Sequence, residues 1–213
     1  MEFKRKPLII ALAVAMTGLL PFATSSPAQA ISADYERIAT INTNAKVADG
    51  KIFHEKKKLD NRDFHVTRAI IDTSPDHVWT YLTDLNKAPQ VFSNLKKARL
   101  VDQKDNRKKI EFQVASLGGL VKYDYVLHVV EEKPYEMEWS RASGAFKRND
   151  GFWSLKPLDG GKRTLVTYGK HIDGGLFVPQ MIVDKQLKGI MPEVITNIRS
   201  AVANDRKRIA SKP

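Results

Sequence analysis

Alternation of apolar and polar residues dominates the middle of the chain and predicts half-buried strands. Over 107–116, Ile110, Phe112 and Val114 alternate with charged or polar residues, and a period of two is expected of a strand with one buried face. Similar alternation recurs in later segments, which short turns at Gly-Gly pairs separate. Consecutive strands joined by short turns predict an antiparallel meander.

Helical periodicity appears before and after this meander. Pro75 follows Ser74, a common helix start, and the apolar residues after it recur at helical spacing. The predicted elements are strands over 51–55 and 64–72, a helix from 75 to 85, a short helix over 88–94, strands over 98–103, 107–116, 120–132, 135–141, 151–155 and 164–172, and a C-terminal helical region whose first piece ends near Gly189 and whose second starts at Pro192.

Residues 1–30 have the layout of a secretory signal peptide. Basic residues at 4–6 precede an apolar run over 8–20, and Ala28-Gln29-Ala30 supplies a small-x-small cleavage site. The alternative is a transmembrane anchor, but the run is shorter than the roughly 20 residues that span a bilayer. We therefore expect cleavage after Ala30 and a periplasmic protein, with a lead-in segment over 31–49 and one domain over 50–210.

Composition narrows the classes of function. The chain has no cysteine, which excludes disulfides, thiolate metal sites and a cysteine nucleophile. Its net charge of +11 favours transient contact with anionic surfaces, and outside the cytoplasm these are lipid head groups. A nucleic-acid partner is not expected, because the basic clusters at 56–58 and 206–208 lack the interleaved aromatic residues of a single-strand binder.

Familiar catalytic motifs are missing from the sequence. The five histidines do not fall at a metal-ligand spacing, and no nucleophile elbow, P-loop or dinucleotide-binding glycine pattern occurs. We therefore predict no metal and no cofactor. What remains is a set of large amphipathic side chains at the alternate strand positions that are expected to face inward, which we call the inward parity of the meander: Tyr123, Tyr125, Trp139, Trp153 and Tyr168.

Two basic residues, Arg141 and Lys170, share that inward parity. Charged groups are almost never fully buried unless they are paired. Either these side chains reach water at strand ends, or they border a cavity with polar contents and fix an anionic head group there.

The order of a hairpin, two short helices, a long meander and a C-terminal helix resembles the helix-grip fold of the START-like (Bet v 1-like, SRPBCC) superfamily. Particular residues are similar to its bacterial polyketide cyclase/dehydrase branch, to which the coenzyme Q-binding proteins are related. They are Ile71-Asp72-Thr73-Ser74-Pro75, Val78-Trp79, Leu82-Thr83-Asp84, Gly144-Ala145-Phe146-Lys147-Arg148, Gly151, Trp153, Gly160-Gly161, Thr164 and Thr167-Tyr168.

The resemblance implies an α+β domain whose curved antiparallel sheet wraps around a long C-terminal helix and leaves an apolar tunnel. It also implies a ligand site formed by Tyr123, Tyr125, Trp139, Arg141, Trp153, Tyr168, Met191, Ile195 and Ile198. The first hypothesis is an exported carrier of a lipid, quinone or polyketide-like molecule. The alternatives are a cyclase/dehydratase-type enzyme that uses Tyr, Lys or Arg groups of the pocket, and a module that docks on anionic membrane.

Overall fold

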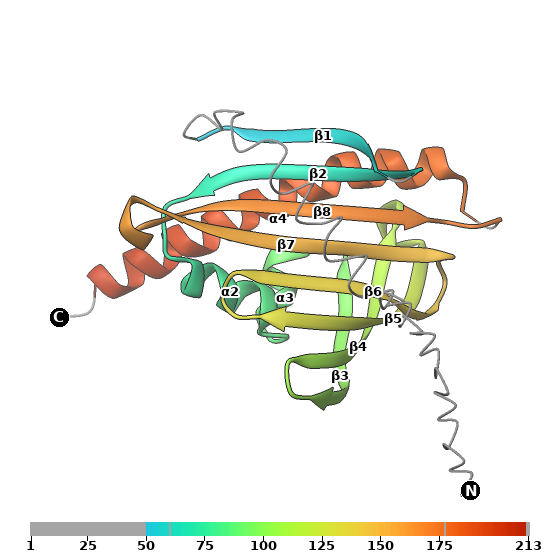
Figure 1. The fold of residues 1–213 in the computed structure, drawn as a ribbon, viewed down its shortest axis with the longest axis horizontal. Coiled ribbons are helices and arrows are strands. Elements are labelled where there is room, and N and C mark those ends of the chain that lie inside the picture. The colour runs from blue at the N-terminus through green and yellow to red at the C-terminus, as the bar shows by residue number, and fades with distance from the viewer. Residues whose placement is uncertain (1–49, 60, 177, 212–213) are drawn as a thin grey trace, which may run out of the picture.

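One curved sheet carries the C-terminal helix on its concave face (Figure 1). The computed structural model describes residues 50–59, 61–176 and 178–211, so the predicted signal peptide and lead-in segment lie outside the described residues. Its elements are β1 (Ile52–Leu59), β2 (Arg62–Ile71), α2 (Pro75–Thr83), α3 (Ala88–Val91), β3 (Leu95–Lys104), β4 (Arg107–Ser116), β5 (Val121–Glu132), β6 (Glu136–Gly144), β7 (Arg148–Leu158), β8 (Arg163–Asp173) and α4 (Gln180–Ala210).

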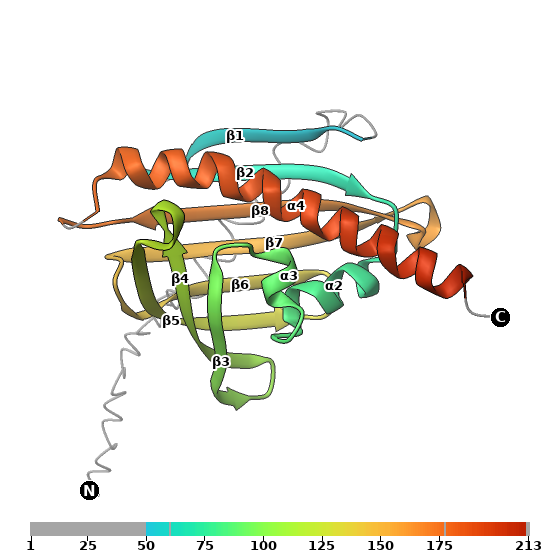
Figure 2. The same cartoon turned by 180° about the vertical axis from the view of Figure 1, so that it is seen from behind.

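The sheet has eight strands in the order β1-β2-β8-β7-β6-β5-β4-β3, and every neighbouring pair is antiparallel. Figure 2 shows α4 crossing in front of β2 and β8, while α2 and α3 lie over the part of the sheet near β6 and β7. The predicted fold class is confirmed: a curved antiparallel sheet with a long C-terminal helix and two short helices after the first hairpin.

Helix α2 begins where the sequence predicted. Ser74 is its N-cap in extended conformation, and its side chain accepts a hydrogen bond from the His77 backbone N–H at 3.4 Å. Pro75 occupies the first turn, where a missing N–H costs no helical hydrogen bond. The helix buries Val78 and Trp79, and this fixes its approach to the sheet.

The C-terminal region differs from the two pieces predicted from Gly189 and Pro192, because α4 is one continuous helix with Pro192 inside it. An interior proline removes one helical hydrogen bond and disfavours the helix. The neighbours of Pro192 explain why the helix continues: Met191 and Ile195 are fully buried, and Val194 is 1% exposed. Burial of such side chains stabilises by about 1.5–3 kcal/mol each, which offsets the cost of the proline.

A chain of polar contacts connects the first turns of α4 to β1 and β2. His54 contacts Thr67 at 2.8 Å and His65 at 3.1 Å through its two ring nitrogens. The other ring nitrogen of His65 lies 3.3 Å from an Asp184 carboxylate oxygen, and Lys56 donates to the second oxygen at 2.7 Å. These contacts hold the first turns of α4 against β1 and β2, in addition to its hydrophobic packing on the sheet. We call His54, Lys56, His65 and Asp184 the polar anchor.

This anchor predicts a pH dependence of stability. Burial lowers the pKa of both His54 and His65 below the ordinary value of 6.5. As the pH falls below 6.5, the unfolded chain takes up protons before the folded protein does, so the free energy of unfolding decreases. Thermal unfolding between pH 7.5 and 5.5 measures this, and the His54→Gln/His65→Gln double variant should show a flatter profile. Parallel profiles for the wild type and the double variant would show that His54 and His65 do not cause the pH dependence.

Candidate ligand-binding site

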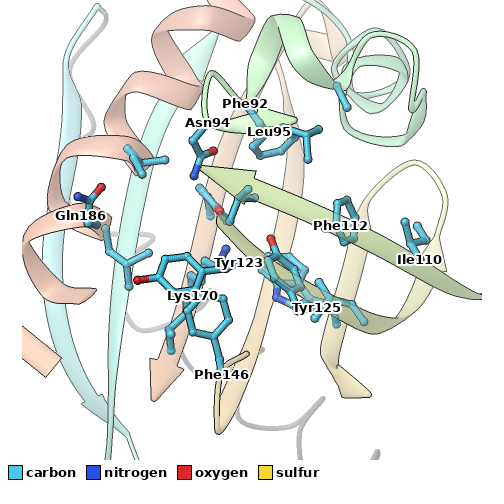
Figure 3. A pocket seen from close by; sticks show the side chains of 18 of the residues that line it. Phe92, Asn94, Leu95, Ile110, Phe112, Tyr123, Tyr125, Phe146, Lys170 and Gln186 are labelled. Carbon is cyan, nitrogen blue, oxygen red and sulfur yellow. The ribbon is translucent and has the colours of Figure 1, made fainter. Parts of the chain in front are cut away.

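A cavity of about 180 Å³ lies between the concave face of the sheet, the first half of α4 and the segment around α2 and α3. In the view of Figure 3, Tyr123 and Lys170 lie between Gln186 of α4 on one side and Phe112 of β4 on the other. Strands β4 to β8 all contribute inward-facing side chains to its lining. The cavity is therefore the space that the wrapped sheet and α4 leave between them.

Aromatic rings form much of the wall. Trp153 and Tyr168 stack with ring centroids 3.9 Å apart and an interplanar angle of 7°. The ring centroid of Tyr125 lies 5.5 Å from that of Phe146 and 5.6 Å from that of Phe112. Such pairs hold one another in fixed orientations, so this wall is preorganised rather than assembled around a ligand.

Five of the nine residues predicted to bind a ligand line this cavity: Tyr123, Tyr125, Trp139, Trp153 and Tyr168. The other four, Arg141, Met191, Ile195 and Ile198, are not among its lining residues. The three from α4 are fully buried and belong to the hydrophobic core. Arg141 instead donates a hydrogen bond from its guanidinium to the Gly144 carbonyl at 3.0 Å, near the end of its own strand.

Sequence reasoning missed the part of α4 that faces the cavity. The lining residues from this helix are Ile182, Val183, Gln186, Leu187 and Ile190. These residues recur every three or four positions, which indicates one face of a helix. They lie about one to four turns before Ile195 and Ile198, the residues that the sequence analysis selected. Phe146, in the connection between β6 and β7, also lines the cavity, and no periodicity pointed to it.

Among the residues that the structure describes, Lys170 is the one basic residue that lines the cavity. Burial lowers the pKa of its ammonium group to about 8. Within the residues that the structure describes, no hydrogen bond or ion pair joins Lys170 to another side chain. A lysine in such surroundings can donate a hydrogen bond to an acceptor atom of a ligand, or exchange a proton near neutral pH.

Other polar groups lie near Lys170 in the sheet. The Trp139 indole N–H is buried and lacks a hydrogen-bond partner among the described residues. Burial raises the pKa of both the Tyr125 and Tyr168 hydroxyls, and the neighbouring Tyr125 raises the pKa of Tyr168 further. We call Lys170, Trp139, Tyr125 and Tyr168 the polar cluster.

The family comparison agrees with this geometry. A family model described as "Polyketide cyclase / dehydrase and lipid transport" matches residues 71–199, which run from the end of β2 to the second half of α4. The chain belongs to this family. Among curated proteins, no sequence matches significantly.

Solved structures share the family's fold at low sequence identity. Human StAR-related lipid transfer protein 5 is 14% identical with a TM-score of 0.65, over 84% of this chain and 97% of that one. A STAR-related lipid transfer protein from Xanthomonas axonopodis is 16% identical with a TM-score of 0.62, over 73% and 96%. The Zhui aromatase/cyclase from a Streptomyces species is 13% identical with a TM-score of 0.53, over 74% and 95%.

These polyketide cyclase/dehydrase and lipid transport relatives show that one fold is used by lipid transfer proteins and by aromatase/cyclases. The described residues contain no cluster of three or more side chains suited to hold a metal ion. Among the described helices, none combines the length and apolar character needed to cross a membrane.

Proposed function

We propose that this chain binds and carries a single-chain hydrophobic or amphipathic molecule in the cavity between the sheet and α4. The observation that carries the proposal is the lining itself: apolar and aromatic side chains with a few polar groups, which is typical of small-molecule sites. At about 180 Å³, the cavity is smaller than the 300–1,000 Å³ of sites for drug-sized ligands. This size favours one alkyl chain over two.

Burial of the chain supplies the affinity. Each methylene group that leaves water contributes about 0.8 kcal/mol, so an alkyl chain of ten carbons contributes about 8 kcal/mol, which corresponds to micromolar binding before the cost of immobilisation is subtracted. The stacked pair Trp153 and Tyr168 is already in place, and a preorganised wall loses little freedom on binding.

Tryptophan emission tests this proposal. The chain has three tryptophans: Trp139 and Trp153 line the cavity, whereas Trp79 is buried outside it. Titration with decanol or decanoate should change the emission of the wild-type protein. The Trp79→Phe variant should keep the whole change, because both pocket tryptophans remain.

The control is a variant that keeps only the tryptophan outside the cavity. The Trp139→Phe/Trp153→Phe double variant retains Trp79, so its emission should not respond to either amphiphile. An unchanged response in this double variant would place the ligand elsewhere on the molecule and overturn the proposal.

The second candidate function is a cyclase/dehydratase-type enzyme, and the polar cluster is the observation that favours it. General acid–base catalysis works best when the pKa of the group lies near the working pH, and burial brings the pKa of Lys170 to about 8. Mass spectrometry of a hydroxylated polyketide thioester after incubation separates the two functions. A carrier returns the molecule unchanged, whereas a dehydratase removes one water.

We also propose that the protein works outside the cytoplasm and contacts anionic membrane transiently. The signal-like pattern over 1–30 and the net charge of +11 support both parts. Expression of the full chain followed by mass measurement of the periplasmic fraction tests export, since cleavage after Ala30 leaves Ile31 at the N-terminus. Co-sedimentation with anionic vesicles that does not weaken as salt rises would contradict the electrostatic contact.

A further inference from the structure

Lys170 lies in a row of residues that crosses the concave face of the sheet. Its register partner on β7 is Gly151, and Gly151 in turn pairs with Trp139 on β6. On the other side, Lys170 pairs with His65 on β2. Directly opposed residues point to the same face, so Trp139, Lys170 and His65 share the face that α4 covers.

Gly151 brings Trp139 toward Lys170. An added Cβ at Gly151 would lie 2.1 Å from Cζ2 and 2.6 Å from Cε2 of Trp139. The indole ring therefore extends across Gly151 in the direction of β8, the strand that carries Lys170. Because Cε2 is bonded to Nε1, the unpartnered indole N–H is at this end of the ring.

Two of the polar groups here, Lys170 and Trp139, can donate hydrogen bonds but cannot accept them. The Lys170 ammonium has three N–H donors and the Trp139 indole has one, and neither has a hydrogen-bond partner among the described residues. The acidic residue that lines the cavity, Glu131, is occupied by Lys108, whose ammonium donates to both carboxylate oxygens at 2.8 Å. His65 is occupied as well, by His54 and Asp184.

A neighbouring buried amide is also incompletely hydrogen-bonded. Asn149 is completely buried on β7 beside the Tyr125 hydroxyl, whose pKa it lowers, but neither its nitrogen nor its oxygen has a hydrogen bond of normal geometry within the described part of the chain. Its register partner, Ile172, lies two residues after Lys170 and lines the cavity. Buried polar groups without partners are costly, and a ligand with acceptor atoms would remove part of that cost.

We propose that the carried molecule is a single-chain amphiphile with a negatively charged, acceptor-rich head group, and that this head group binds the Lys170 ammonium and the Trp139 indole N–H. The alkyl chain then extends along the aromatic wall toward Phe112 and Ile110. This inference rests on the proposed carrier function and adds the chemical class of the ligand. Carboxylates and phosphate monoesters share the required chemistry.

Binding of undecanoate, decyl phosphate and decanol to the wild-type protein tests the inference, since the three probes share a ten-carbon alkyl chain and differ in the head group; decanoate has one chain carbon fewer. A charged hydrogen bond contributes about 1.5–3 kcal/mol, which corresponds to roughly 10- to 150-fold in affinity. The wild type should bind at least one anionic probe at least tenfold more tightly than decanol. The ratio of undecanoate to decyl phosphate distinguishes a fatty acid from a phosphorylated lipid as the source of the head group.

The Lys170→Met variant assigns the preference to one side chain. It should lose the preference for the anionic probe and bind decanol within about threefold of the wild-type value, because an apolar side chain of similar size replaces a half-buried charge. Lys122→Met is the matched control: Lys122 is exposed on β5, and its variant should keep the wild-type preference. Trp139→Phe should reduce the preference by a smaller factor.

The outcomes separate the two levels of the account. Equal binding of all three probes by the wild type, or an undiminished preference in Lys170→Met, would overturn the head-group inference and leave the carrier function standing. Failure of the wild type to bind any probe would overturn the carrier function, and the inference with it. A Lys170→Met protein that does not fold is replaced by Lys170→Gln in the same comparison.

Discussion

Replacement of Ile195 by alanine is expected to lower the free energy of unfolding by about 2–5 kcal/mol. Ile195 is completely buried in the core where α4 packs on the sheet, so truncation leaves a cavity that the rigid surroundings fill only in part. Chemical denaturation followed by circular dichroism measures the change. The neighbouring Thr196 is exposed, and Thr196→Ala should stay within about 0.5 kcal/mol of the wild type.

The same variant separates a structural role from ligand contact. Ile195 does not line the cavity, whereas Ile190, on the same helix, does. At temperatures where every protein is folded, Ile190→Ala should weaken decanoate binding, and Ile195→Ala should leave it nearly unchanged. The reverse order would restore Ile195 as a ligand contact, as the sequence predicted.

Gly151→Ala is the second substitution with a large expected effect. Besides the Trp139 ring, the added Cβ would lie 2.5 Å from the Gly169 carbonyl oxygen, a backbone atom that cannot turn aside. Overpacking of this kind costs about 1–3 kcal/mol. Displacement of the Trp139 ring should also reduce the selectivity for an anionic head group, since the indole N–H is no longer held beside Lys170.

A second glycine provides the control for Gly151→Ala. Gly189 lies within α4, and an added Cβ there meets no atom within 4 Å. Alanine favours the helix over glycine by about 1 kcal/mol, so Gly189→Ala should raise the free energy of unfolding. If Gly151→Ala left the free energy of unfolding unchanged or raised it, as Gly189→Ala should, the close contact of Trp139 with Gly151 would be wrong.

Strand parity was the most informative part of the sequence. The alternation over 107–116 and 120–132 gave the inward faces of β4 and β5, and Tyr123 and Tyr125 line the cavity accordingly. Parity is a local property, which a chain of short turns preserves from one strand to the next. The meander and the aromatic wall could therefore be predicted from residue types, whereas the wrapping of the sheet around the C-terminal helix came from the family resemblance.

Arg141 and Lys170 show that strand parity alone does not predict which inward-facing residues line the cavity. Both residues have inward parity in the sequence, but only Lys170 lines the cavity. The register between β5 and β6 shifts between Val126 and Leu127, and Leu127 is the partner of Arg141. A bulge changes the local twist and direction of a strand, and the apolar-polar pattern contains no sign of it.

The residues of α4 that line the cavity were missed for a different reason. Apolar residues occur on more than one face of α4, because one side of its first half meets the cavity while later residues such as Ile198 pack into the core. Periodicity identifies faces of a helix but not which of two buried surfaces each face contacts. Pro192 added to the error, since a proline ordinarily marks the start of a new helix.

Isoleucine methyl NMR tests the central claim, that the ligand occupies the cavity between the sheet and α4, most directly. Four isoleucines line the cavity, Ile110, Ile172, Ile182 and Ile190, whereas Ile71, Ile195 and Ile198 are buried outside it. Addition of decanoate to the full chain should shift the methyl signals of the first group, with the second group nearly unmoved. Shifts confined to isoleucines outside the cavity would contradict the account.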